Sequence, residues 1–134
     1  MAYLVISNDE QFVAMMTSLL HGDVMQCLQV EEVLSQKYVK AQLIIWHEPH
    51  PTSKTLMHCE QLFQRHIPIL YFTVDMTNAV ERIIPFVFDF FIMPYNTLYI
   101  TAKIQTAMQY SLSMKALQQQ TRFLEKDLQT AKNV

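Results

Sequence analysis

The sequence is poor in glycine, in cysteine and in charge. It contains one Gly, two Cys and 16% charged residues, and its formal net charge is −2. A loop that cradles phosphate with backbone amides needs several glycines, so both common glycine-rich phosphate loops are excluded. Two cysteines are too few for a disulfide framework, which favours a reducing compartment. A net charge this close to zero argues against binding through nucleic acid phosphates, so we expect no direct nucleic acid contact.

Long apolar runs and a secretion signal are also missing. A membrane-spanning helix needs roughly 20 consecutive apolar residues, and no segment reaches that length. The first residues, Met1 to Leu4, contain no basic region and no cleavage pattern. We therefore expect a cytoplasmic protein that makes no membrane contact. Its 134 residues correspond to one ordinary domain.

Short apolar segments typical of buried strands alternate with segments of helical periodicity. We expect Asn8 or Asp9 to cap the first helix and Gly22 to end it. The expected strands cover residues 3–7, 24–30, 42–46, 69–74 and 87–92. The expected helices cover residues 12–20, 31–38, 55–66, 76–84 and 97–132. Five such repeats predict an α/β fold with a doubly wound, five-stranded parallel sheet and helices on both faces.

In such sheets, functional side chains gather at the carboxyl ends of the strands. The residues at four of these ends are Asn8 and Asp9, His47, Thr73, and Met93. Two of these residues are followed by a proline: Pro51 lies four residues after His47, and Pro94 directly follows Met93. The order and spacing of these residues resemble those of CheY-like response-regulator receiver domains, a flavodoxin-like (βα)5 fold. The resemblance covers roughly residues 2 to 116.

The resemblance implies a phosphorylation pocket that has lost its chemistry. In that family an acidic pair binds Mg²⁺, an Asp accepts the phosphoryl group, and a Ser or Thr and a Lys complete the site. Here Asn8 replaces one acid while Asp9 keeps the other, His47 replaces the phosphoacceptor, and Met93 replaces the Lys. Only Thr73 is retained besides Asp9. Because the reaction needs a carboxylate nucleophile, a metal and a cation, the resemblance implies no enzyme activity and no cofactor.

The resemblance also assigns structural roles. Thr73 and Phe90 take the places of the family's hydroxyl–aromatic switch pair, and Pro94 would follow a cis peptide bond. A fold kept without its chemistry implies a pseudo-receiver of a bacterial two-component-type regulator. Such a module would act by dimerisation and by contact with a partner signalling protein or a fused effector domain, which it would control.

Other interpretations of His47 and its neighbours remain open. An imidazole can accept a phosphoryl group, but Met93 offers no charge to stabilise it. A neutral or paired His47 near Asp9 is the simpler interpretation. Residue types that bind zinc also occur nearby, although a proline-interrupted loop gives them no fixed spacing: His47, Glu48, His50, His58 and Cys59. The alternative function is therefore a sensor that binds a small ligand or metal in the former pocket.

Residues 97–132 contain neither Pro nor Gly and predict one long helix. From Tyr110 onward, apolar or small residues recur at spacings of four and three, as in the seam of a left-handed coiled coil. This coiled-coil stripe comprises Tyr110, Met114, Leu117, Thr121, Leu124, Leu128 and Ala131. We expect residues 1–116 to form the receiver-like domain and 117–134 a helical extension toward an effector domain outside this sequence. The helix would form a homodimer, unless it packs back on its own domain.

Overall fold

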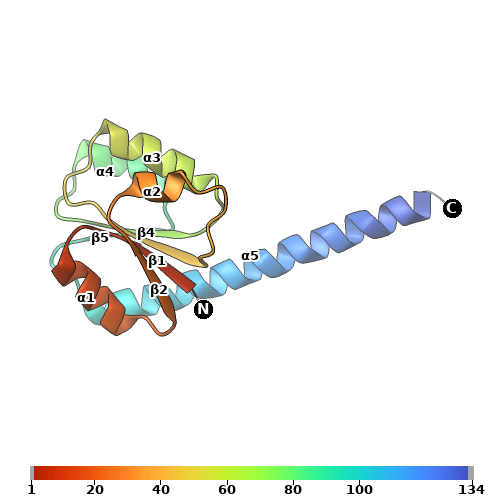
Figure 1. Ribbon diagram of the computed structural model, residues 1–134, viewed down its shortest axis with the longest axis horizontal. Coiled ribbons are helices and arrows are strands. Elements are labelled where there is room, and N and C mark those ends of the chain that lie inside the picture. Colours follow the sequence, from red (N-terminus) through yellow and green to blue (C-terminus); the bar gives the residue numbers. More distant parts are fainter. Residues whose placement is uncertain (1, 133–134) are drawn as a thin grey trace.

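Five parallel strands form one sheet in the order β2-β1-β3-β4-β5 (Figure 1). The computed structural model describes residues 2–132, with side chains described up to Arg122 and at Leu124. The strands are β1 (Ala2–Ile6), β2 (Asp23–Cys27), β3 (Leu43–His47), β4 (Ile69–Thr73) and β5 (Asp89–Ile92). The helices are α1 (Glu10–Leu19), α2 (Val30–Leu34), α3 (Ser53–Phe63), α4 (Asn78–Ile83), the 3-10 turn η1 (Ile84–Phe86) and α5 (Thr97–Lys132).

Helices cover both faces of the sheet, so its central strands are buried on both sides. Figure 1 shows α1 and the first part of α5 on one face, with α2, α3 and α4 on the other. Successive strand residues point to opposite faces, so Val5 and Ile45 join one core while Ile6 and Trp46 join the other. This is why β1, β3 and β4 are continuous apolar runs in the sequence.

The prediction of a doubly wound five-stranded parallel sheet is confirmed. Several predicted bounds differ by one to three residues, and the helix expected over residues 31–38 already ends at Leu34. Two further details were wrong. The second strand ends at Cys27 rather than at residue 30, because Val30 begins α2 and packs in the core. Gly22 does not cap α1, because the helix already ends at Leu20 in extended backbone and Gly22 lies in the turn before β2. Asp9 is the N-cap of α1, and the Met93–Pro94 peptide is cis, both as expected.

The last helix is a single uninterrupted element that extends beyond the sheet (Figure 1). Its first part packs on the sheet through Ile100, Ile104, Ala107 and Met108, all of which are buried. With a rise of about 1.5 Å per residue, the whole helix is on the order of 50 Å long. In the part of the chain that the structure describes, no helix is long and apolar enough to cross a membrane.

Candidate functional site

The candidate site lies where β1, β3, β4 and β5 end. The register pairs Ile6 with Trp46, His47 with Phe72, and Thr73 with Ile92, so the residues at the ends of these strands meet at one edge of the sheet. The carboxyl ends of all four strands lie at this edge because the strands run parallel. Each strand is followed by a loop that leads into a helix. The structure therefore brings His47, Thr73 and the residues after β1 and β5 to this edge, as the sequence predicted.

The His47 side chain is buried and is held by one hydrogen bond and one aromatic contact. Only 8% of the residue is exposed. Its Nδ1 lies 2.9 Å from the Ser7 hydroxyl oxygen, and its ring stacks on Phe12 with the centroids 4.1 Å apart. Burial lowers the pKa of His47, and the nearby Asp9 carboxylate opposes this only in part. The imidazole is therefore a neutral ring fixed by one hydrogen bond and one aromatic face.

An aromatic cluster closes the site above His47. Phe12 meets Phe72 and Tyr95 edge to face, with centroids 5.1 and 6.2 Å apart. The Tyr95 hydroxyl donates a 2.8 Å hydrogen bond to the Thr73 carbonyl. Burial and the neighbouring Asp9 raise the pKa of Tyr95 to about 12, so its hydroxyl stays protonated and able to donate. Aromatic rings thus pack around His47 at this edge of the sheet.

The two residues expected to be remnants of the acidic pair have different surroundings. Asn8 is exposed. The Asp9 carboxylate accepts hydrogen bonds from the backbone N–H groups of Gln11 and Phe12, at 2.9 and 3.2 Å. The Asp9 N–H in turn donates to the Ser7 hydroxyl at 3.0 Å. The carboxylate is thus committed to the amino end of α1, where it also offsets the helix dipole.

The remaining site residues lie on β4, on β5 and directly after β5. Thr73 is fully buried, and its hydroxyl donates a 3.4 Å hydrogen bond to the Pro49 carbonyl. Met93 is 52% exposed and its thioether carries no charge. Phe90 is partly buried and packs against the core beneath α3 and α4. Thr73 is therefore buried at this edge, whereas Phe90 pairs with Tyr71 further back along the sheet and contributes to the core there.

A groove of about 460 Å³ lies beside His47 on the α2 and α3 side of the sheet. Of the five pocket residues, Asn8 and His47 line it. His58 contacts Glu31 across it at 3.8 Å. Within residues whose side chains are described, no three His, Cys, Asp or Glu groups come together as a metal site. Burial also raises the pKa of Cys59 to about 12, which opposes the thiolate form that binds zinc.

Three residues that shape the site were not predicted from the sequence. Ser7 was assigned to the end of a strand, yet its hydroxyl holds both His47 and the Asp9 N–H. Phe12 was expected in the helix core, and nothing in the periodicity indicated that it stacks on His47. Tyr95 follows the cis proline, and no local pattern indicated its hydrogen bond to Thr73.

The sequence matches no known family model. It also has no significant match among curated proteins. Solved structures resemble it strongly in shape. The crystal structure of an adenylate cyclase from Rhodopirellula baltica superposes with a TM-score of 0.75 at 18% identity, covering 90% of this chain and 96% of that one. The signal receiver domain of an HD domain-containing protein from Pseudomonas fluorescens gives 0.71 at 12% identity, with 84% and 97% covered.

A third similar structure carries a fused coiled coil. It contains a yeast Spc42 trimeric coiled-coil segment fused to another structure, and superposes with a TM-score of 0.68 at 14% identity. The match covers 98% of this chain and 94% of that one. At such low identities these likenesses establish the fold alone. The five-stranded parallel sheet, its strand order and its helices are those of the CheY-like receiver fold.

Proposed function

We propose that this chain is a pseudo-receiver, a signalling module of a two-component-type regulator that acts without aspartyl phosphorylation. The observation that carries the proposal is the environment of His47. It occupies the end of β3, where the family has its phosphoacceptor, and it is buried between Ser7 and Phe12. An imidazole cannot form an acyl phosphate, and its Nδ1 is already hydrogen-bonded.

The surroundings of His47 also lack the charges that phosphoryl transfer needs. A transferred phosphoryl group is stabilised by cations placed where negative charge develops. Met93 supplies none, and Asp9, the nearest carboxylate, caps α1. The pocket formed by Asn8, Asp9, His47, Thr73 and Met93 is therefore best understood as a packed remnant.

We assign signal output to α5, as a coiled-coil extension that begins near residue 117. The described members of the coiled-coil stripe include Tyr110, Leu117 and Leu124, which are 48%, 55% and 62% exposed. At 3.6 residues per turn, this stripe lies roughly 100° around the helix from the side that packs on the sheet. The domain contacts Tyr110 through Phe88 and partly covers Met114, but it leaves Leu117 and Leu124 exposed, and a second copy of the chain can cover them. Leu128 and Ala131 lie where side chains are not described.

A coiled coil would pass a state of the receiver-like domain to an effector domain or partner protein. Contacts between domains, rather than a covalent modification, would set that state. The similar structure that contains a trimeric coiled coil supports association through a long helix, and its three chains make a trimer an outcome to test beside the dimer.

Incubation with acetyl phosphate and Mg²⁺ followed by intact mass spectrometry tests the proposal. We expect no phosphorylated species, because His47, at the end of β3 where the family has its phosphoacceptor, carries an imidazole and no carboxylate. A receiver domain with the complete family site, treated in parallel, is the positive control. Stoichiometric, Mg²⁺-dependent phosphorylation of this chain would overturn the proposal.

The groove beside His47 supports one alternative, a sensor for a small ligand or metal. It is large enough for a small molecule and is bordered by Glu31, His50 and His58. A thermal-shift screen with Zn²⁺, Ni²⁺ and cyclic nucleotides distinguishes the two functions. Stabilisation above about 1 °C that is lost in His58→Ala would favour the sensor.

A further inference from the structure

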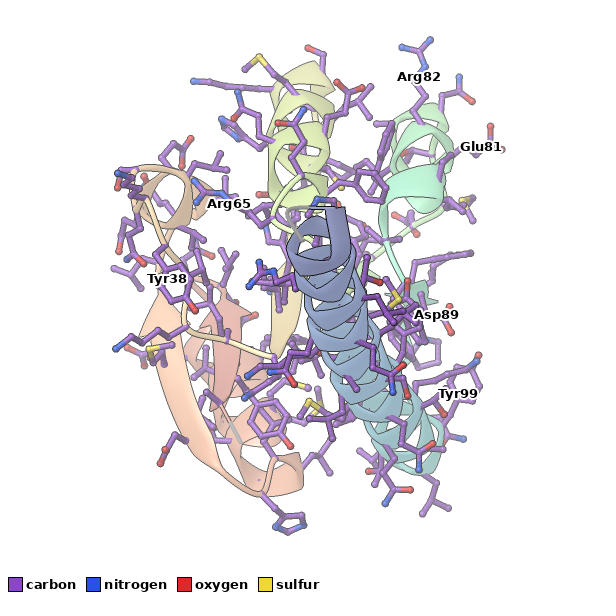
Figure 2. The ribbon with its side chains drawn as sticks, turned by 90° about the vertical axis from the view of Figure 1, so that its right-hand side faces the viewer. Tyr38, Arg65, Glu81, Arg82, Asp89 and Tyr99 are labelled. Carbon is purple, nitrogen blue, oxygen red and sulfur yellow. The ribbon has the colours of Figure 1, made fainter. Side chains whose placement is uncertain are left out.

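A second and larger groove lies at the opposite edge of the sheet, where α5 leaves the domain. Its volume is about 790 Å³. One wall is the loop between α2 and β3 together with the end of α3, and the other is α5. Figure 2 shows Tyr38 and Arg65 on one side of the protruding helix, with Asp89 and Tyr99 on the other.

The charge of this basic groove has a single sign. Five of the ten Lys and Arg residues of the chain line it, although the whole chain has a net charge of −2. Among the residues that the structure describes, no Asp or Glu lines it. The two ion pairs seen in that same part of the chain, His58–Glu31 and Lys103–Asp89, lie elsewhere. The charged and titratable residues of the basic groove are Lys37, Lys40, Arg65, His66, Lys115 and Arg122.

The face of α5 that points toward the domain changes from apolar to polar and basic residues where the helix reaches this groove. The side that packs on the sheet carries Ile104 and Met108, and the same side continues as Ser111, Lys115, Gln118 and Arg122, at spacings of three and four. The face that points back at the domain is thus apolar over the sheet and basic beyond it. It shares only Met114 with the coiled-coil stripe, so association of two helices leaves its Lys115 and Arg122 open.

The opposite wall is held in place by Arg65. Its guanidinium donates to the carbonyls of Lys37 and Leu34, at 3.0 and 3.2 Å, which fixes the loop that carries Lys37 and Lys40. Cations gathered without carboxylate partners repel one another, and an anion placed among them relieves that repulsion. Arg and Lys are the side chains that recognise phosphate oxygens most effectively.

We propose that the basic groove binds a small molecule of nucleotide size that carries several phosphoryl groups. The volume lies within the range of small-molecule sites, and cations from two walls would meet the phosphates from both sides. Because one wall belongs to α5, the bound anion fixes the helix against the domain. The site needs neither the loss of phosphorylation nor dimerisation, so it goes beyond the proposed function.

Titration calorimetry with tripolyphosphate and with ATP tests the site in the full chain. We expect saturable binding of one anion per chain, weakened about tenfold or more by Lys115→Ala with Arg122→Ala. Both residues are exposed, so the fold is retained, and circular dichroism checks it. The matched control, Arg82→Ala with Lys103→Ala, removes the same charge at two residues that line neither groove and should leave affinity unchanged.

Three results would overturn the proposal. One is the absence of binding by both anions at millimolar concentration. Another is equal weakening by the control pair, which would indicate attraction by total charge. The third is tighter binding of duplex DNA, with more chains bound as the duplex lengthens, which would make the groove part of a nucleic acid surface. The phosphorylation assay and these titrations have independent outcomes, so either proposal can fail alone.

Discussion

At the scale of single residues, His47 links the sequence of the site to its packing. A carboxylate at the end of β3 would need water, a metal or a cation around it. A neutral imidazole can instead be buried against Phe12 and hydrogen-bonded to Ser7. The aromatic cluster of Phe12, Phe72 and Tyr95 is therefore compatible with His47 and would oppose an ionised Asp at the same place.

Replacing His47 by Gln should change how stability depends on pH. Burial holds the pKa of His47 below its ordinary value of about 6.5. As pH falls below about 6.5 the unfolded chain binds a proton that the folded chain refuses, so the wild type loses stability in acid. The His47→Gln variant lacks this contribution. Urea unfolding measures the difference in free energy of unfolding between the wild type and His47→Gln, and this difference should shrink from about pH 8 to about pH 5. A difference that grows in favour of the wild type as the pH falls would contradict a buried neutral imidazole.

Replacing Phe12 by Ala should destabilise the domain strongly. Phe12 is 5% exposed and contacts three aromatic rings, so the truncation leaves a cavity and uncovers His47. We expect a loss of about 3 to 5 kcal/mol in the free energy of unfolding. The matched control is Phe63→Ala, because Phe63 is 50% exposed and should cost about 1 kcal/mol. Similar losses for both variants, measured by urea unfolding, would show that Phe12 is not a packing centre.

At the scale of elements, α5 contributes three different surfaces to the molecule. Ile100, Ile104 and Met108 pack on the sheet, the coiled-coil stripe is exposed on a second side, and Lys115 and Arg122 face the basic groove. The absence of Pro and Gly allows one uninterrupted helix to carry all three. This helix is the element in which core packing, association and ligand binding can influence one another.

Charges introduced into the coiled-coil stripe should separate the chains. Leu117→Glu with Leu124→Glu places two carboxylates in an apolar seam, where burial of charge opposes association. We expect a monomer mass by light scattering for this variant and a dimer for the wild type. Ala116→Glu with Gln119→Glu puts the same charge on the opposite side of the helix and should remain dimeric. A monomeric wild type, or dissociation by both pairs alike, would refute the assigned seam.

Periodicity was sufficient to predict elements but not their mutual contacts. The strands and the full extent of α5 followed from apolar runs and from the absence of helix breakers, because these depend on each segment alone. Gly22 was misassigned because Leu20 ends α1 without glycine. The contacts of Ser7 and Phe12 with His47 depend on how β1, α1 and β3 pack together, which no local pattern encodes.

At the scale of the whole molecule, charge is distributed unevenly, and the α/β domain is followed by a helix that extends beyond it. The chain has a net charge of −2, yet five cations line one groove. A near-neutral average charge therefore disfavours phosphate contacts over the chain as a whole but not at this groove. The buried contacts of α5 end at Met108, and the helix continues well past them. Among the described residues of α5, the last buried one thus comes before residue 117, where we propose that the extension begins.

Removal of residues 118–134 should therefore yield a folded monomer. The core residues of α5 all precede the cut. The stripe residues that remain, Tyr110, Met114 and Leu117, span about two turns and offer too little apolar surface to hold two chains together. Light scattering should give the mass of one shortened chain, which is less than half the mass of the wild-type dimer, with cooperative thermal unfolding retained. A truncated chain that stays dimeric would place the interface on the domain rather than on α5.

The central claim is that a receiver fold has been kept around a site that no longer takes up a phosphoryl group. Beryllofluoride with Mg²⁺ mimics an acyl phosphate at such a site, and NMR of backbone amides reports it residue by residue. We predict that the amides of Ser7, His47 and Thr73 keep their positions after the addition, while those of a receiver domain with the complete site shift. Mg²⁺-dependent shifts centred on His47 and Thr73 would contradict the claim.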